Sequence, residues 1–269
     1  MAEKIEDEVA RAQGGSQAAL TEVVRQSQDR IYHLALRMLA DPVQAEDATQ
    51  DILILLVTKL GSFRGESSFL TWSYRVAVNH LLSAQKIRAR DPGLSFDLFG
   101  ADLADGLVDE AAASAEDVVL LNELRVGCTM AMLLCLDMAH RLAYVLGDVL
   151  EFDHRSAAEI SSVPPATHRQ RLARARAQVQ DFTAQHCGVV SAGARCSCPR
   201  RLPAAQRAGR VGTKAVLSRD APGYQQVLNQ VAGVEKDLRA MKAQQAMAAF
   251  SSPRDFAAHL EDILSPGPV

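Results

Sequence analysis

Apolar side chains recur at helical spacing through the first ninety residues of the chain. In the first run these positions, spaced three or four apart or adjacent, are Ile31, Leu34, Met38 and Leu39. This helix should end at Asp41-Pro42, where the next one starts. The second helix, 43–60, is acidic at its start and apolar afterwards, and a glycine-containing loop at 61–68 separates it from a third helix over 69–90. The pattern predicts one helical block over residues 1–90.

A second helical block follows a break in the pattern at Asp91-Pro92-Gly93. Residues 91–116 are acidic and rich in Ala and Gly, so we predict a flexible linker there. Helical periodicity resumes over 117–185, and this block ends in a short helix, a turn at Pro164-Pro165 and a second helix. We therefore predict an all-α protein of two small helical domains, joined by a flexible acidic linker, with a helix-turn-helix in the second domain.

Residues 186–269 form a C-terminal extension. Its first part, 186–223, is rich in Gly, Arg, Pro and Cys and is expected to be irregular. One long helix should follow, with an apolar seam at Val227, Val231, Val234, Leu238 and Met241. Packing on the protein's own domain is the simpler interpretation of this seam, with a partner interface as the alternative. A last short helix should start at Ser252-Pro253, with the serine as N-cap.

The second helix of the helix-turn-helix is strongly basic. Its apolar side consists of Leu172, Ala175 and Val179, and that of the first helix of Ala158, Ile160 and Val163. The intervening arginines are Arg169, Arg171, Arg174 and Arg176. A helix in this position enters the DNA major groove, and the arginine fork binds phosphate oxygens or the O6/N7 edge of guanine. Solvated protein surfaces carry basic helices too, so the interpretation depends on the rest of the chain.

Charge is unevenly distributed, although the net charge is only −3. Residues 97–123 hold eight acids and no Lys or Arg, whereas residues 166–214 hold ten Lys or Arg and one acid. Such asymmetry favours a nucleic-acid contact. The charged N-terminus is unlike a signal peptide, and no apolar run reaches the roughly 18 residues needed to span a membrane. We therefore expect a cytoplasmic protein with reduced cysteines, of which Cys128 and Cys135 belong to the core.

Two motifs in the first block occur in a characteristic order. The first is an acidic helix whose pattern positions are Asp41, Ala45, Glu46, Asp47, Gln50 and Asp51. The second lies in the loop and the third helix, at Phe63, Arg64, Gly65, Ser67, Thr71, Trp72, Tyr74, Arg75, Val76, Ala77 and Asn79. Together they resemble the promoter-melting domain of bacterial RNA polymerase sigma factors of the extracytoplasmic-function type, in the sigma-70 family. The block that ends in the helix-turn-helix is similar to the −35-binding domain of that family.

The resemblance covers about residues 15–90 and 117–182, and it implies the domain boundaries. Residues 1–90 would bind core polymerase and melt the −10 element, 91–116 would be the linker, and 117–185 would bind the −35 element. Residues 186–269 lie outside the two-domain core, and we hypothesise that they regulate the activity of the chain in cis. Two departures bear on packing: Leu53, Leu56 and Val57 stand where the family has aromatic residues, and Ser161-Ser162 replaces the common Leu-Gly.

The resemblance also implies three contact sets. Core polymerase would contact Glu46, Asp47, Gln50 and Asp51. The −10 element would contact Phe63, Arg64, Gly65, Ser67, Trp72, Tyr74, Arg75 and Asn79. The −35 element would contact Thr167, His168, Arg169, Gln170, Arg171, Arg174 and Arg176. Promoter DNA and core polymerase are thus the expected partners, with an anti-sigma factor as a further candidate.

The chemistry of these residues fits such roles, with alternatives. Melting requires a pocket for an unstacked base and groups that hold single-strand phosphates, which the 61–68 loop could supply. Trp72 can equally be a core residue of a helical bundle. The acidic helix suits a basic protein surface rather than DNA. Favourable interaction with the helix dipole explains Glu46 and Asp47 as well, but Asp51 less so.

Four soft ligands follow the helix-turn-helix, namely His186, Cys187, Cys196 and Cys198. Their spacing could supply a tetrahedral Zn²⁺ site or thiolates for Cu⁺, but it lacks the paired C-x2-C spacing of ordinary zinc motifs. Incidental reduced thiols are the alternative, and we expect no cofactor to be required.

Three classes of function compete. A sigma factor, which is not an enzyme, explains both the acidic helix and the loop. A stand-alone helix-turn-helix regulator explains only the second block. An enzyme is disfavoured, because the chain has no phosphate-binding glycine loop, nucleophile elbow or HExxH pair.

Overall fold

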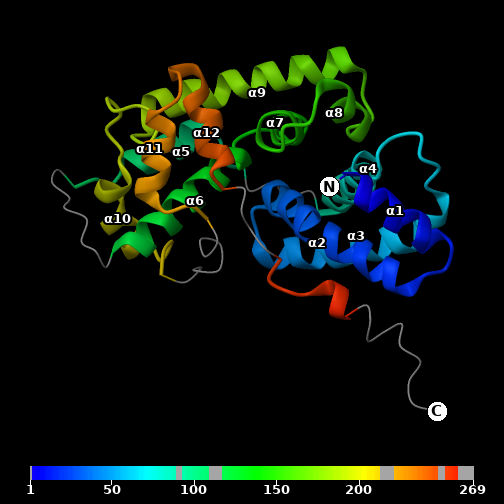
Figure 1. Cartoon of the computed structure of the whole chain (residues 1–269). Helices are drawn as coiled ribbons and strands as arrows, with labels where there is room; N and C mark the ends of the chain where they lie inside the picture. The colour runs from blue at the N-terminus through cyan, green and yellow to red at the C-terminus, as the bar shows by residue number, and fades with distance from the viewer. Residues whose placement is uncertain (1, 89–92, 109–116, 213–220, 248–251, 260–269) are drawn as a thin grey trace. The chain divides into compact units, whose positions relative to one another are not determined.

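The computed structural model describes residues 2–88, 93–108, 117–212, 221–247 and 252–259. Within these residues the chain is helical and contains no strand, as the all-α prediction requires. It divides into two compact units (Figure 1). The first comprises Met1–Ala89, Arg155–Pro165 and Ser251–Val269, and the second comprises Arg90–His154 and Ala166–Phe250. The predicted extension is therefore not a separate part, since its residues are shared between the two units.

The first unit is built on a bundle of helices from the N-terminal block. They are α1 (Ala2–Gln13), α2 (Gln17–Leu39), α3 (Pro42–Lys59) and α4 (Phe69–Arg88), with a 3-10 turn η1 (Leu60–Ser62). Ser16 caps α2 by accepting a hydrogen bond from the Ala19 amide, and Asp41 caps α3 through the amides of Val43 and Gln44. Pro42 occupies the first turn of α3, where its missing N–H costs nothing. The helices close over a core that includes Leu34 and Ile52.

The second unit contains α5 (Phe96–Ala104), α6 (Val118–Leu134), α7 (Met138–Tyr144), a π-helical turn η3 (Val145–Val149), α9 (Pro165–His186), α10 (Cys198–Arg207), α11 (Tyr224–Ala232), a 3-10 turn η5 (Lys236–Leu238) and α12 (Arg239–Gln245). Helix α8 (His154–Ile160) lies almost wholly in the first unit. The turn η3 approaches α9 closely at Gly147. A Cβ there would meet the Leu172 side chain at 2.6 Å, so any other residue at 147 would have to displace that side chain.

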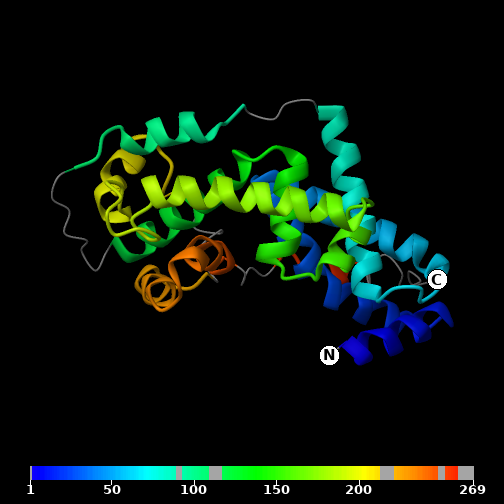
Figure 2. The ribbon, with the colours of Figure 1, turned by 90° about the horizontal axis from the view of Figure 1, so that it is seen from above.

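The segment predicted to be a flexible linker contains a packed helix. Helix α5 is capped by Ser95, and its Phe99 and Leu103 form a buried cluster with Met132 and Phe182. Figure 2 shows α5 running beside α9. The prediction for 91–116 was wrong over 96–104, because apolar residues three and four apart outweigh the acidic composition around them. Within the predicted linker, residues 91–92 and 109–116 lie outside the described residues.

The predicted tail helices also differ. The expected long helix is broken into α11 and α12 near Gly233. Val227 and Val231 are buried as predicted, but Leu238 is exposed. Residues 198–207, expected to be irregular, form α10 with Pro199 in its first turn. Near the C-terminus the helical turn at 256–259 is capped by Asp255 rather than by Ser252.

Candidate functional site

The loop after η1 lines an open pocket, at the place where we expect from the sequence a site for an unstacked base. An open pocket of about 250 Å³ is lined by Ser62, Phe63, Arg64, Glu66, Ser67, Trp72 and Arg75. Its volume is several times the roughly 30 Å³ that one water molecule occupies in the liquid. Gly65, at φ +71°, provides the left-handed turn in this loop, and only glycine adopts that conformation without cost. The loop and the start of α4 thus form one concave polar site with an aromatic wall.

Helix α1 braces this loop. The Gln13 side-chain amide donates to the carbonyl oxygens of Leu60 at 2.9 Å and Phe63 at 2.8 Å. The Glu6 carboxylate accepts a hydrogen bond of 2.8 Å from the Phe69 amide at the start of α4. Sequence reasoning missed Glu6 and Gln13, since nothing in the local pattern shows that α1 reaches residues about fifty or sixty positions away.

The ring of Trp72 belongs to both the core and the pocket wall. It is buried, with ring centroids 5.4 Å from Phe63 and 5.7 Å from Phe69. Tyr74 is buried in the helical bundle, and burial raises its pKa to about 12. The prediction that Tyr74 contacts DNA is therefore wrong in this structure, because its side chain faces inward. Arg64 and Asn79 are exposed, as a contact with DNA needs.

Arg75 has a partner within the first unit. Its Nη1 donates to Glu159 Oε1 of α8 at 3.2 Å, and both side chains are more than a third exposed. A contact of this kind is worth little in water. Arg75 can therefore exchange this carboxylate for a phosphate at small cost.

Helix α3 presents the predicted acidic surface. Val43, Asp47, Asp51 and Ile54 are all exposed and recur four, four and three residues apart, which places them on one face. Glu46 and Gln50 lie on the flank of that face and are partly covered. Asp51 also approaches His80 of α4, with 3.7 Å between Oδ2 and Nε2. Exposed apolar and acidic groups on one helix face suit a protein partner with a basic surface.

The predicted DNA-reading set on α9 divides by helix face. Arg169, Gln170 and Arg174 are exposed, and Thr167 and Arg171 are partly covered. His168 has no exposed surface, and neither ring nitrogen has a hydrogen-bond partner. Burial and the nearby charges of His154 and Arg171 lower its pKa. His168 is thus part of the packing rather than a DNA contact, which corrects the prediction.

Arg176 also makes a contact within the protein, an ion pair with Asp148. Its Nε donates to Asp148 Oδ2 at 2.9 Å and its Nη2 to Oδ1 at 2.5 Å. This bidentate pair holds η3 against α9 and raises the pKa of Arg176. The predicted role of Arg176 in reading DNA is therefore corrected to an intramolecular ion pair.

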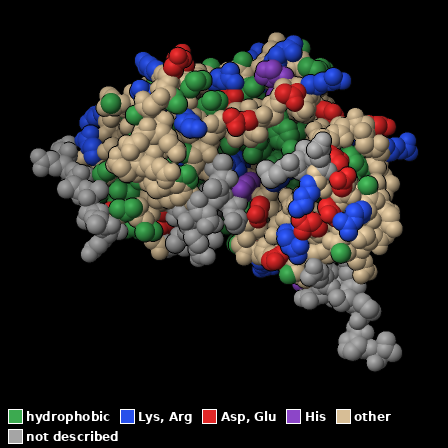
Figure 3. Space-filling model, in the orientation of Figure 1, with side chains coloured by type: hydrophobic (Ala, Val, Ile, Leu, Met, Phe, Trp, Pro, Cys, Tyr) green, Lys and Arg blue, Asp and Glu red, His purple; other side chains and the backbone are tan. Residues whose placement is uncertain are grey.

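On the face seen in Figure 3, acidic and basic side chains are intermixed. Contacts of a partner with that face would therefore depend on individual exposed side chains more than on the net charge.

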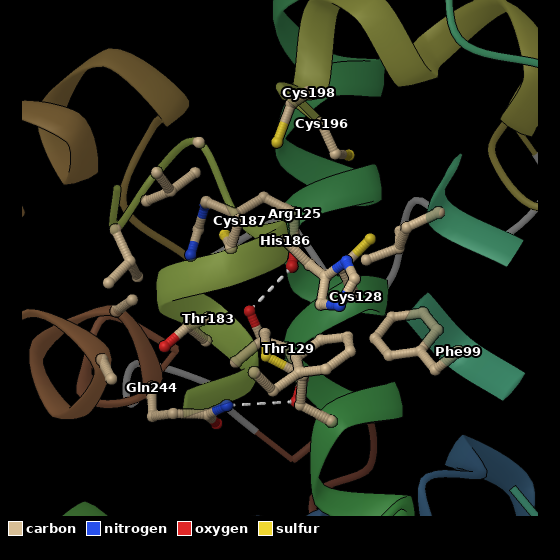
Figure 4. A pocket seen from close by; sticks show the side chains of 18 residues that line it. Phe99, Arg125, Cys128, Thr129, Thr183, His186, Cys187, Cys196, Cys198 and Gln244 are labelled. Atoms are coloured by element: carbon tan, nitrogen blue, oxygen red, sulfur yellow. Dashed lines mark hydrogen bonds between the residues drawn. The ribbon is translucent and has the colours of Figure 1, made fainter. Parts of the chain in front are cut away.

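Four of the five cysteines line an apolar pocket in the second unit (Figure 4). Cys128, Cys187, Cys196 and Cys198 share it with His186, but their sulfur atoms point in different directions. Burial raises the pKa of each of these thiols, to about 12 for Cys128 and about 11 for Cys196. Among the described residues, no group of three or more His, Cys, Asp or Glu side chains could hold a metal ion. The structure does not support the predicted Zn²⁺ or Cu⁺ site at His186, Cys187, Cys196 and Cys198, because their side chains do not converge on one point as a tetrahedral ligand set must.

Comparisons with known proteins point to one family. Residues 23–91 match the family model described as sigma-70 region 2. The "ECF RNA polymerase sigma-E factor" of Escherichia coli K12 is 30% identical over 187 residues, which cover 67% of this chain and 96% of that protein. The "ECF RNA polymerase sigma factor SigW" of Bacillus subtilis is 29% identical over 182 residues, 64% of this chain and 92% of that protein. The "RNA polymerase sigma-H factor" of Pseudomonas aeruginosa is 30% identical over 171 residues, 62% of this chain and 88% of that protein.

A solved structure is also similar, at 22% identity and a TM-score of 0.42 over 58% of this chain and 91% of the other. It is the sigma factor RpoE of Bartonella quintana in complex with the anti-sigma factor NepR. No described helix of the present chain is both long and apolar enough to cross a bilayer.

Proposed function

Because the chain belongs to the ECF family of RNA polymerase sigma factors, we propose that it binds core RNA polymerase and directs promoter-specific, DNA-templated transcription initiation. The pocket at 62–67 with Trp72 and Arg75 is the observation that carries this proposal. A stand-alone regulator that only binds duplex DNA has no use for a concave site of this kind.

The pocket combines the groups that capture of an unstacked base requires. Phe63 and Trp72 provide an aromatic wall, Ser67 and Glu66 provide hydrogen-bonding groups, and Arg64 at the rim can neutralise a phosphate. Since Gln13 fixes two carbonyls of the loop, the pocket is formed before DNA arrives. Binding of the −10 element then costs little ordering of the protein, which favours the open state of the duplex.

Core polymerase binds, in this proposal, to the exposed face of α3. Asp47 and Asp51 would pair with a basic surface of the polymerase, and Ile54 would add apolar contact. The −35 element would be read by the exposed residues of α9, Arg169, Gln170 and Arg174, with Arg171 at the edge. Two readers on one chain select promoters that carry both elements at a suitable separation.

The proposed activity involves no covalent step by this chain and no cofactor that it holds. The chain supplies recognition and melting, while catalysis rests with the polymerase. Such a protein acts in the cytoplasm, where polymerase and chromosomal DNA meet.

Reconstituted transcription tests the proposal. The full chain is added to core polymerase from a related bacterium, and transcripts are mapped on genomic DNA. We expect Arg64→Ala to reduce promoter opening, with the exposed Arg25→Ala on α2 as matched control. Asp47→Lys should abolish binding to core, whereas Asp7→Lys, at an exposed acid of α1, should not. A chain that binds DNA by itself but never associates with core would overturn the proposal and support a stand-alone regulator.

A further inference from the structure

A C-terminal segment of the chain, residues 252–259, lies on the surface formed by α2 and α3 in the first unit. The Ser252 amide donates to Asp29 Oδ1 at 2.8 Å, and the Ala257 amide donates to Gln28 Oε1 at 3.2 Å. Arg254 forms an ion pair with Glu46 of α3. Both ends of the segment are thus tied to side chains of α2, and its middle is tied to the acidic helix.

Phe256 anchors the segment. Its side chain is 6% exposed, and the following Ala257 is fully buried. The pocket beside it is lined by Val24, Gln50, Leu53, Ile54 and Val57, together with Phe256 and His259. A residual volume of about 50 Å³ remains there, so the ring does not fill the groove completely. The side-chain contact around Phe256 is mainly apolar, and the ion pair and the two hydrogen bonds to α2 add polar contacts.

The local structure of the segment aims these side chains inward. Asp255 Oδ1 accepts hydrogen bonds from the amides of Ala257 at 3.1 Å and Ala258 at 3.2 Å, which caps the helical turn at 256–259. In this turn Phe256 and Ala257 are buried and Ala258 is exposed, and the Phe256 side chain shares the pocket with α3. The segment therefore has a defined local structure and packs on the first unit through buried side chains.

The occupied surface overlaps the one assigned above to polymerase. Glu46 and Gln50 belong to the predicted polymerase contacts, and both are engaged by the segment. On the adjoining face, Asp47, Asp51 and Ile54 remain exposed. A partner could thus make its first contacts at that face, whereas Glu46 is paired with Arg254 and Gln50 is partly covered while the segment is seated.

We propose that residues 252–259 act as an internal competitor for core RNA polymerase, covering one flank of α3 until polymerase displaces them. This proposal rests on the proposed function, since it assumes that α3 is the polymerase-binding helix. A tethered segment competes at a high effective concentration, so even a weak contact lowers the fraction of chains open to the partner. The apparent association constant for polymerase equals the intrinsic constant multiplied by the fraction of chains that are open.

Affinity for core polymerase, measured with the full chain, is the first test. Phe256→Asp puts a charge into the apolar groove and should release the segment. Ala258→Asp is the matched control, because it adds the same charge at an exposed position of the same turn. If about one chain in ten is open in the wild type, we expect Phe256→Asp to bind core about tenfold more tightly and Ala258→Asp to bind like the wild type. Arg254→Ala removes only a surface ion pair and should tighten binding at most about fivefold.

Hydrogen exchange of the unmodified chain is the second test, and it does not depend on a variant folding. The amides of Ser252 and Ala257 should be protected in the free protein and should exchange freely once core is bound. Equal affinity of wild type and Phe256→Asp, weaker binding by Phe256→Asp than by Ala258→Asp, or continued protection in the complex would each overturn the proposal. If no variant binds core at all, the proposed function itself fails, and the competition hypothesis fails with it.

Discussion

The ion pair between Arg176 and Asp148 allows an effect of substitution on stability to be distinguished from an effect on DNA binding. The Asp148 side chain is 3% exposed, whereas that of Arg176 is 45% exposed. Arg176→Ala would leave the carboxylate unpaired where water hardly reaches it. Breaking a buried pair costs about 3–5 kcal/mol, and losing an exposed pair costs about 0.2–1 kcal/mol. Since only one partner is buried, we expect a loss of about 2 kcal/mol in the free energy of unfolding of the second unit.

Calorimetry of the full chain measures this loss as a lower transition temperature, by roughly 4–8 °C for a domain of this size. Arg174→Ala is the control, because Arg174 carries the same charge on the same helix and is also exposed, but it is not part of the pair with Asp148. It should change stability by less than about 0.5 kcal/mol and should weaken binding to promoter DNA. The reasoning is refuted if Arg176→Ala unfolds like the wild type and loses as much DNA affinity as Arg174→Ala.

Four further outcomes are expected. Arg171→Ala should weaken binding to a promoter fragment by about 1–3 kcal/mol in fluorescence anisotropy if it reads a base, while a loss independent of sequence would place it on phosphate. Gln13→Ala frees the Leu60 and Phe63 carbonyls, so it should slow promoter opening, followed by 2-aminopurine fluorescence, while affinity for core stays unchanged. Burial lowers the pKa of His33 to about 3, so below about pH 6.5 the unfolded chain takes up a proton at this residue that the folded chain does not take up. The free energy of unfolding, complete above that pH, should therefore fall on acidification by up to about 1.4 kcal/mol per pH unit from this group. Urea unfolding of His33→Asn should show a shallower fall. With a pKa of about 12 for Cys128 and about 11 for Cys196, thiolate fractions at pH 8 are about a thousandth or less, so a thiol reagent should react with the native chain far more slowly than with the unfolded chain.

The sequence predicted those elements whose cause is local. Helices α2, α3 and α4 follow from apolar periodicity and from the Asp41-Pro42 cap, and both are visible within a few residues. Contacts between distant residues were missed, such as Gln13 with the loop carbonyls and Arg176 with Asp148. Helix α5 was missed for a different reason. Its apolar residues recur at helical spacing, but the acidic residues around them are equally typical of a linker.

Helix register explains why only part of each predicted contact set is available to a partner. On α9 the buried stripe includes Leu172, Ala175 and Val179, and His168 lies one turn before Leu172 on that same stripe. Its burial could have been predicted from the register alone, and the exposed Arg169 and Arg174 lie off this stripe.

The same argument applies to α3, where Ile52 and Leu56 form the buried stripe and Asp47 and Asp51 face outward. Between these two faces lies the flank that carries Glu46 and Gln50, which the segment 252–259 covers. A motif matched by residue type alone does not distinguish these three faces. Helix register distinguishes the buried stripe from the exposed face that a partner can contact. Only the packed structure shows that the chain's own segment 252–259 occupies the flank between them.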